Sequence, residues 1–201
     1  MKRLAERAAA ARVAVTAAEI LQLEVYFALL KRWSARMNLT ALPLEGPPDA
    51  TIDRLFIEPL AAARYVPKSP IAWVDVGSGG GSPAIPLRVL RHQARLTMVE
   101  SKGRKAAFLR EAVRVLDLHG AEVQGDRFED LPGTGEADLV TVRAVRVDLE
   151  MLQLCRAALR PGGGLLLFQS APIEADVQGF KRLRSVQLTG TPAFLDILKA
   201  I

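Results

Sequence analysis

A glycine-rich segment near the middle of the chain constrains the fold more than any other feature. The apolar run 71–76 ends at Asp75 and Val76, and four glycines follow within the five residues 77–81. Glycine lets the backbone adopt positive φ and approach a ligand closely, because no Cβ stands in the way. Pro83 suits the first turn of a helix, where a missing N–H costs nothing. The segment therefore predicts a buried strand, a ligand-binding turn and a helix.

The residues around this turn favour one class of nucleotide-like ligand over another. A dinucleotide-binding turn follows the pattern Gly-x-Gly-x-x-Gly or Ala, whereas this chain has Gly77, Gly79 and Gly81, followed by Ser82. Asp75 would repel a pyrophosphate but would attract an ammonium group. We therefore expect S-adenosylmethionine, with its amino-acid end and sulfonium near the turn, and disfavour a nicotinamide oxidoreductase.

Composition and charge limit the possible partners. The chain has 201 residues, half of them hydrophobic, with a net charge of +5 and a pI near 9.7, which favours a polyanionic partner. Aromatic residues make up only 5%, which argues against a platform for stacking several bases. With one cysteine, Cys155, and two histidines, we expect neither a disulfide nor a metal.

Hydropathy indicates where the protein resides. No run approaches the roughly eighteen apolar residues of a membrane-spanning helix, and the charged N-terminus does not resemble a signal peptide. We expect a cytoplasmic monomer that does not contact a membrane.

The order of the elements predicts an N-terminal helical extension, residues 1–66, followed by a ligand-binding domain, residues 67–201. Helices are expected over 1–15, over 17–36 after a capping box at Thr16 and Glu19, and over 51–64 with a break or a new start at Pro59. Residues 38–48 form a loop.

From residue 71 onward, strand-like and helix-like segments alternate, which predicts an α/β fold. Strands are expected at 71–76, 95–100, 120–124, 138–142 and 164–169, and helices at 83–91, 103–116 and 147–159. Gly and Pro at 161–164 should separate the last helix from its strand. The central sheet should be mostly parallel and twisted, with helices on both faces. Residues 185–188 and 194–201 are expected to pair as an antiparallel hairpin.

Ligands of such sheets bind beyond the carboxyl ends of the strands, so the residues that follow each strand are the candidates. Glu100 ends the second strand 23 residues after Gly77, where a carboxylate can accept both hydroxyls of a ribose. Lys102, Arg104 and Lys105 then open a helix whose dipole disfavours cations. Either a phosphate backbone passes over this helix start, or the cations are simply solvated.

The third and fourth strands end in further candidates. Asp126 or Glu129 could hold an adenine edge while Phe128 packs beside the ring, and spacing does not decide between the two acids. Arg143 and Arg146 suggest an anion or carbonyl contact, with a surface salt bridge as the alternative. No Ser-His-Asp or Cys-His set is available, which disfavours hydrolase chemistry.

Several of these motifs together resemble the glucose-inhibited division protein B family, the small-subunit ribosomal RNA methyltransferases G. The resemblance covers about residues 30 to 170, and its most specific part follows Glu100. The matching segments are Asn38-Leu39-Thr40, Val74 to Leu87, Glu100-Ser101-Lys102-Gly103-Arg104-Lys105, Phe108-Leu109-Arg110, Arg127-Phe128-Glu129 and Arg143-Ala144.

The resemblance implies a Rossmann-like class I methyltransferase fold. It further implies methylation of ring nitrogen seven of a guanosine in the decoding-region stem-loop of 16S rRNA. Donor binding would fall to Gly77, Ser82, Phe128 with Glu129, and Arg143, which is also the candidate catalytic residue. Ring nitrogen seven carries a lone pair and no proton, so no general base is required.

The chain also departs from the family pattern. The family's His-x-x-Asp-Ser segment reads here as residues 55–59, without the His and Ser, and its C-terminal arginine segment is shortened to residues 191–194. Ser82 replaces a larger apolar residue, and Glu100 replaces the commoner Asp. Two alternatives therefore stay open: a methyltransferase of another RNA or a small acidic molecule, and a binding module without catalysis.

Overall fold

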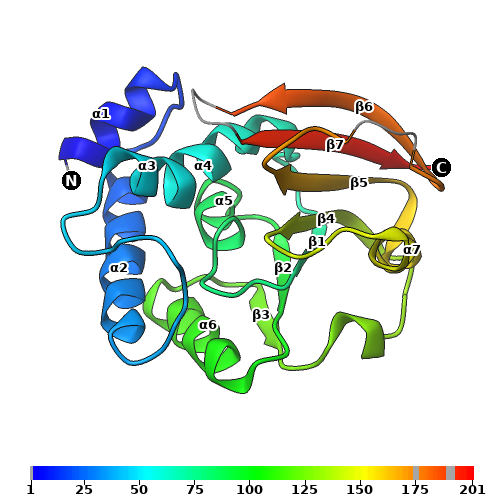
Figure 1. Ribbon diagram of the computed structural model, residues 1–201, viewed down its shortest axis with the longest axis horizontal. Helices are drawn as coiled ribbons and strands as arrows, with labels where there is room; N and C mark the ends of the chain where they lie inside the picture. Colours follow the sequence, from blue (N-terminus) through cyan, green and yellow to red (C-terminus); the bar gives the residue numbers. More distant parts are fainter. Residues whose placement is uncertain (1, 174–176, 189–192) are drawn as a thin grey trace.

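The computed structural model describes residues 2–173, 177–188 and 193–201, and its centre is a seven-stranded sheet (Figure 1). Strands β1 to β5 run parallel, β7 is antiparallel to both β5 and β6, and the order is β3-β2-β1-β4-β5-β7-β6. The strands are β1 (Ala72–Val76), β2 (Arg95–Val99), β3 (Ala121–Gln124), β4 (Ala137–Arg143), β5 (Leu159–Gln169), β6 (Phe180–Gln187) and β7 (Phe194–Ala200). The predicted mostly parallel sheet and its terminal hairpin are confirmed.

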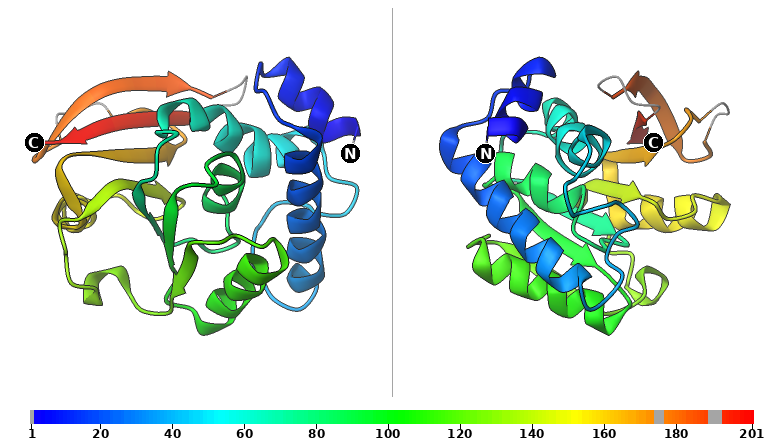
Figure 2. Two further views of the ribbon diagram at one scale, coloured as in Figure 1. Left: turned by 180° about the vertical axis from the view of Figure 1, so that it is seen from behind. Right: turned by 60° about the vertical axis from the view of Figure 1, so that its left-hand side comes forward.

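The helices cover the two faces of the sheet unequally. Helices α2, α5 and α6 pack together over one face, while α7 contacts β4 and β5 on the other (Figure 2). The helices are α1 (Lys2–Ala10), α2 (Ala17–Ser34), α3 (Asp49–Ile52), α4 (Glu58–Ala62), α5 (Ala84–Leu90), α6 (Gly103–Val115) and α7 (Leu149–Ala158). Among the described residues, no helix has the length and apolar character that a membrane crossing requires.

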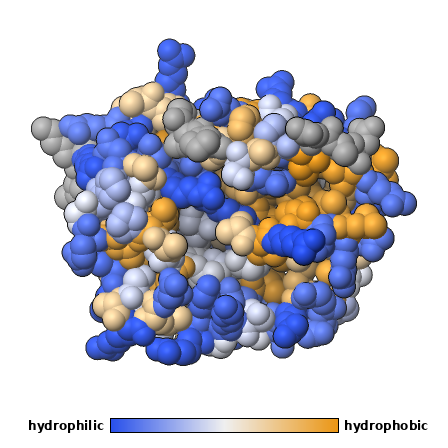
Figure 3. All heavy atoms as spheres, in the orientation of Figure 1, coloured by the Kyte–Doolittle hydropathy of each residue, from blue (hydrophilic) through white to orange (hydrophobic). Residues whose placement is uncertain are grey.

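The core consists of two hydrophobic clusters, one on each face of the sheet. Because side chains alternate along a strand, Trp73 of β1 faces the cluster beneath α2, α5 and α6, and Val76 faces the cluster beneath α7. The larger cluster includes side chains of α1, α2 and α4, so the predicted extension 1–66 shares its core with the sheet. In Figure 3, apolar side chains gather on the right, over β4, β5 and α7, where helices cover the sheet least.

Local sequence signals explain where several helices begin and end. The predicted capping box is present: the Thr16 side chain accepts from the Glu19 N–H, and the Glu19 carboxylate accepts from the Thr16 N–H. Helix α7 begins at Leu149 instead of 147, because Asp148 caps it by accepting from the Met151 N–H.

The first helix is shorter than predicted. It ends at Ala10 instead of 15, because Arg12 adopts a left-handed φ of 56° that stops the helix. The N–H groups of Arg12 and Val13 donate to the carbonyls of Ala9 and Ala8, closing the helix in the manner of a Schellman motif.

Of the two alternatives predicted at Pro59, the break is wrong, because the chain stays helical from Asp49 to Tyr65. The new helix start is confirmed, because α4 begins at Glu58 with Pro59 in its first turn. A π-helical turn, η1 (Asp53–Ile57), precedes α4, and a 3-10 turn, η2 (Ala63–Tyr65), follows it. Proline lacks the N–H that would bond to the carbonyl four residues earlier, which here is Leu55. The wide turn accommodates the ring, and the Ser82 hydroxyl donates to the Leu55 oxygen over 3.0 Å instead.

The glycines at 162–164 do not separate helix from strand as predicted. They lie inside β5, which begins at Leu159, and the register against β4 shifts between Ala137 and Leu139. Gly162 has a φ of 76°, which allows the strand to bulge there. Residues 191 and 192 of the shortened segment at 191–194 lie outside the described residues.

Candidate functional site

A cavity of about 720 Å³ lies at the carboxyl ends of β1, β2 and β4. Its size is in the usual range of small-molecule sites. Seven of the predicted site residues line it: Gly77, Gly79, Ser82, Glu100, Lys102, Lys105 and Arg143. The sheet topology therefore brings together residues from three separate stretches of the sequence.

The glycine turn forms the floor of this cavity. Gly77, Gly79 and Gly81 have φ values of 68°, 53° and 89°, which residues with side chains rarely adopt. A Cβ on Gly77 would lie only 2.5 Å from Cγ2 of Val145, so the backbone comes close to the loop after β4. Gly81 faces inward, because a Cβ there would lie 2.5 Å from Cδ1 of Ile85.

Helix α2 supports the turn from behind. The hydroxyl of Tyr26 donates to the Gly80 carbonyl over 2.5 Å, and burial raises the pKa of this tyrosine. The cavity is also lined by Leu30 and the loop 38–42. The N-terminal helices therefore contribute to the site itself, which the residue spacing alone did not indicate.

Glu100 bridges the turn and the start of α6. One carboxylate oxygen accepts from the Gly79 N–H and the other from the Lys102 N–H, each over 2.9 Å. The residue is 7% exposed and lines the cavity. Each carboxylate oxygen can accept a further hydrogen bond, so this carboxylate is fixed in position and still able to accept hydroxyl groups.

Asp75 lies beneath the turn and does not line the cavity. It is 1% exposed, Oδ1 accepts from the Thr141 hydroxyl, and Trp73 Nε1 donates to that hydroxyl over 2.9 Å. Oδ2 makes no hydrogen bond within the described part of the chain. Burial raises the pKa of Asp75 to about 6, although the Thr141 hydroxyl and the Arg143 charge oppose this shift.

Arg143 is the most deeply buried cation at the site. Its guanidinium is ion-paired with Glu58, donates to Ser82 Oγ over 3.1 Å and lies 5.4 Å from the centroid of the Phe168 ring. Burial lowers its pKa to about 10, against the opposing effect of Glu58. The predicted alternative of a surface salt bridge is therefore wrong for Arg143, whose partner is 1% exposed.

Sequence reasoning missed the role of Glu58. The signal was a single carboxylate inside the apolar run 55–60, which is costly to bury without a cationic partner. The Ser82 hydroxyl connects the Arg143–Glu58 pair to the π-helical turn η1, since it accepts from Arg143 and donates to the Leu55 carbonyl. These three side chains and the Leu55 carbonyl form one connected polar network beside the cavity.

The turn after β3 lies apart from this cavity. Phe128 is buried in the cluster on the opposite face of the sheet, within the 3-10 turn η3 (Phe128–Asp130). Asp126 and Glu129 are exposed. None of the three lines the cavity, so the structure does not bring them together with the glycine turn.

The predicted cations divide into two groups. Lys102 and Lys105 line the cavity, and the first turn of α6 contains no acidic residue. Arg104 is exposed and donates to the Arg36 carbonyl over 3.2 Å. Arg146 is exposed and lies 3.7 Å from the carboxylate of Asp148, which fits the predicted alternative of a surface salt bridge.

The arrangement suits a ligand that is part nucleoside and part amino acid. Backbone groups of the glycine turn can approach it closely, and Glu100 can accept from neighbouring hydroxyls. The cationic side chains of Lys102 and Lys105 give the same cavity an affinity for anionic groups. Such a cavity can hold a small donor and receive part of a polyanion.

Comparison with known proteins agrees with this geometry. Residues 19–194 match the family model described as GidB, rRNA small subunit methyltransferase G. Over 141 residues the chain is 40% identical to a ribosomal RNA small subunit methyltransferase G of Xanthomonas oryzae pv. oryzae, covering 70% of this chain and 64% of that protein. A protein of the same name from a Roseiflexus species is 36% identical, covering 79% of this chain and 68% of the relative.

Solved structures share the fold at low sequence identity. A SAM-dependent methyltransferase from Aquifex aeolicus aligns with a TM-score of 0.60 at 14% identity, covering 74% of this chain and 92% of that one. TrmN from Thermus thermophilus aligns with a TM-score of 0.57 at 18% identity, covering 71% and 49%. The predicted Rossmann-like methyltransferase fold is thereby confirmed.

The family match covers most of the chain, including both lysines, Glu100 and the glycine turn. The chain spans 64% of the length of the Xanthomonas relative. On the family match and the fold together, this chain belongs to the rRNA small subunit methyltransferase G family.

Proposed function

We propose that the chain transfers a methyl group from S-adenosylmethionine to ring nitrogen seven of a guanosine in 16S rRNA. The observation that carries this proposal is the shared cavity: Glu100, the glycine turn and two lysines surround one space. Family membership supplies the RNA class, because the named relatives are ribosomal RNA methyltransferases of the small subunit.

Within this proposal, Glu100 accepts the ribose hydroxyls of the donor while the glycine turn lies against it. Asp75 acts from beneath the turn through its negative charge, since it does not line the cavity. The proposed donor site consists of the residues that line the cavity. Asp126, Phe128 and Glu129 are not part of it, because they do not line the cavity. When bound, S-adenosylmethionine supplies an electrophilic methyl group.

The protein's own task is to orient the target base. Ring nitrogen seven already has a lone pair, so alignment of nucleophile and methyl group is the main requirement. Arg143, held by Glu58 and Ser82, is the proposed residue that positions the guanine through its carbonyl oxygen or a nearby phosphate. Lys102 and Lys105 then contact the RNA backbone, with Arg104 and Arg146 as outer contacts.

We propose further that the protein works in the cytoplasm, where ribosomal RNA is found, and as a monomer. The extension 1–66 would then be part of the methyltransferase site, because loop 38–42 and Arg54 line the cavity. Light scattering of the purified chain measures its molar mass, which should be that of a single chain.

The decisive assay uses small-subunit RNA from a strain that lacks the modification. With radiolabelled S-adenosylmethionine, the purified chain should label this RNA, and mass mapping should place the methyl on ring nitrogen seven of one guanosine. RNA from the parent strain is the matched control and should take up no label. Labelling of another RNA, or of neither sample, would contradict the proposal.

A further inference from the structure

A second cavity, of about 770 Å³, lies near the amino ends of β1 and β2, at the opposite ends of the strands from the donor site. It is bounded by the connection after α1, by α4 with η2, and by the end of α5, beside the residues that precede β1 and β2. We call it the basic pocket. Its ionisable lining residues are Arg12, Arg64, Lys68, Arg91 and His92.

The charge of this pocket is unbalanced. Among the residues that the structure describes, no carboxylate lines it, whereas four lining residues are cations in a chain of net charge +5. No ion pair of the described ranges involves these four cations. Cations gathered without counter-charges attract an anion from solution.

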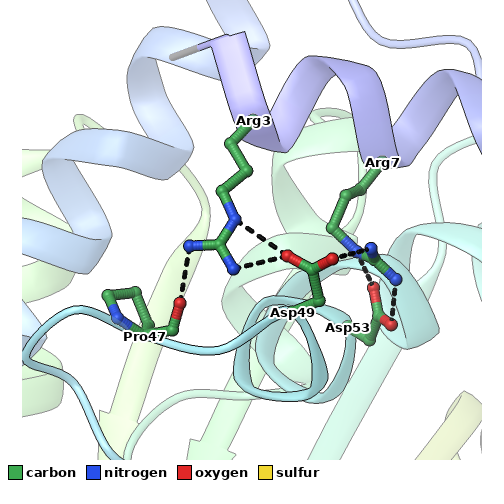
Figure 4. Close-up of polar contacts among 5 residues, drawn as sticks. All are labelled: Arg3, Arg7, Pro47, Asp49 and Asp53. Atoms are coloured by element: carbon green, nitrogen blue, oxygen red, sulfur yellow. Dashed lines mark hydrogen bonds and ion pairs between the residues drawn. The ribbon is translucent and has the colours of Figure 1, made fainter.

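Two acidic residues on the neighbouring elements α3 and η1 are already engaged elsewhere. Arg3 pairs with Asp49, and Arg7 pairs with both Asp49 and Asp53, as Figure 4 shows. These ion pairs attach α1 to α3 and η1. They fix the end of α1, where Arg12 begins the connection that borders the pocket.

The cations on the other wall are anchored by backbone carbonyls. The guanidinium of Arg91 donates to the carbonyls of Val66 and Leu90, each over 2.9 Å, and also to that of Ala63. Arg64 Nε donates to the Ala61 carbonyl over 3.1 Å. Both positive charges are therefore held at the pocket, and an anion entering it would not have to order them.

Two further observations fit a ligand of negative charge. Burial lowers the pKa of Arg91, and the charge of Glu19 opposes this shift only in part, so the guanidinium is incompletely compensated. Arg12 occupies a left-handed position where glycine is preferred, at a cost of roughly 1–2 kcal/mol. An arginine in this strained backbone position, at the border of the pocket, is consistent with a role of the Arg12 side chain in binding an anion.

The lining also narrows the kind of anion. Apart from the imidazole of His92, no residue that lines the pocket has an aromatic ring on which a base could stack, and the other lining residues that carry no charge are aliphatic apart from Gln93. The pocket therefore suits phosphate groups rather than bases.

We propose that the basic pocket binds phosphates of the RNA backbone, as a second contact remote from the site of methyl transfer. This inference rests on the proposed function, which supplies RNA as the polyanion. Because the two cavities lie at opposite ends of the strands, one RNA must curve around the protein, or two RNA segments must meet it. The basic pocket would add affinity without reading sequence.

The test compares two double variants of equal charge change. Arg12→Gln with Lys68→Gln removes exposed cations from the basic pocket and leaves Arg91, which bonds to three carbonyls, in place. Arg114→Gln with Lys181→Gln removes two exposed cations elsewhere. Binding of unmodified small-subunit RNA is measured across a range of salt concentrations, and donor binding is measured by calorimetry.

A plot of log affinity against log salt falls with a negative slope. In the basic-pocket variant this slope should be less steep than in wild type by about 1.4–1.8, since each of two lost phosphate contacts contributes about 0.7–0.9. The control variant should change the slope by much less, and both should bind S-adenosylmethionine as wild type does. Equal slopes in the two variants would overturn the inference while leaving the proposed function intact. Failure of the wild type to bind this RNA would overturn both.

A second arm separates RNA from small phosphate compounds. Pyrophosphate is titrated into the wild type and the basic-pocket variant. Weak binding that RNA outcompetes supports the RNA assignment. Tight binding of pyrophosphate to the wild type alone, with no difference in RNA slope, would assign the pocket to a small phosphate ligand and reject the proposal.

Discussion

The two ends of the parallel strands, called here the carboxyl edge and the amino edge of the sheet, differ in whether their charged side chains are paired. At the carboxyl edge, Arg143 is paired with Glu58, and the carboxylate of Glu100 accepts from two backbone N–H groups. At the amino edge, Arg12 and Lys68 are exposed and have no ion-pair partner in the described chain. Buried, paired charges fix geometry, whereas exposed, unpaired charges attract a partner at long range and are screened by salt.

This difference predicts how each edge should respond to mutation. Changes at the carboxyl edge should affect folding and donor binding strongly, because a buried charge that loses its partner is costly. Changes at the amino edge should leave folding almost unaltered and appear only as salt-dependent RNA affinity.

The largest effect is expected for Glu58→Gln. This change leaves the buried guanidinium of Arg143 without its counter-ion and should lower the free energy of unfolding by about 3–5 kcal/mol. Urea denaturation measures it. The matched control is Glu45→Gln, which breaks the exposed ion pair with Lys31 and should cost less than about 1 kcal/mol.

A double variant sharpens this result. Replacing both partners, by Glu58→Leu with Arg143→Met, should recover much of the stability that Glu58→Gln loses, because no unpaired buried charge remains. Arg54 also loses its pair with Glu58, but its side chain is 36% exposed and can be solvated. Equal losses for Glu58→Gln and Glu45→Gln would mean that the pair is not buried in solution, and the contrast between the two edges would fail.

The next effect concerns the pH dependence of Asp75. Burial raises the pKa of the Asp75 carboxyl group from 3.8 to about 6, so the folded state binds the carboxyl proton more tightly than the unfolded state does. Its contribution to stability is complete below about pH 4 and is lost as pH rises through about 6, a change of about 3 kcal/mol. Relative to Asp75→Asn, the wild type should therefore become less stable over this range.

Denaturation of both proteins between pH 4 and pH 8 measures this difference, and comparison with the variant removes the contribution of other carboxylates. A constant difference in stability across the range would show that Asp75 is not held in the buried environment described above.

A smaller effect is expected for Gly77→Ala. The new Cβ would meet Val145 at 2.5 Å in a backbone of positive φ, which should cost about 1–3 kcal/mol and weaken donor binding. Gly103→Ala is the control: its Cβ would meet nothing within 4 Å, and it lies at the start of α6. Thermal unfolding distinguishes the two, and equal melting temperatures would contradict the role of the turn.

The regular part of the fold could be predicted because its signals are local. Alternating strands and helices, the capping box at Thr16 and the glycine turn lie in contiguous sequence and gave the parallel sheet and the position of Glu100. The strand ends then predicted which residues share a cavity, because parallel strands bring their carboxyl ends to one edge.

The remaining features depend on contacts between distant residues. Pro59 did not end its helix, because a π turn accommodates it and Ser82, far along the chain, bonds to the freed carbonyl. Asp75 reads like a cavity residue in sequence but is buried beneath it. The basic pocket combines three separate segments, so neither its charge balance nor its existence could be seen in the order of residues.

Calorimetric titration of S-adenosylmethionine tests the central claim, which is that the carboxyl edge holds the donor through Glu100. The wild type should bind one molecule. Glu100→Gln should bind at least about tenfold more weakly, because hydrogen bonds to a charged acceptor contribute roughly 1.5–3 kcal/mol. Arg12→Gln with Lys68→Gln should bind as the wild type does. An absence of binding heat in the wild type, or equal affinity in a folded Glu100→Gln variant, would contradict the account.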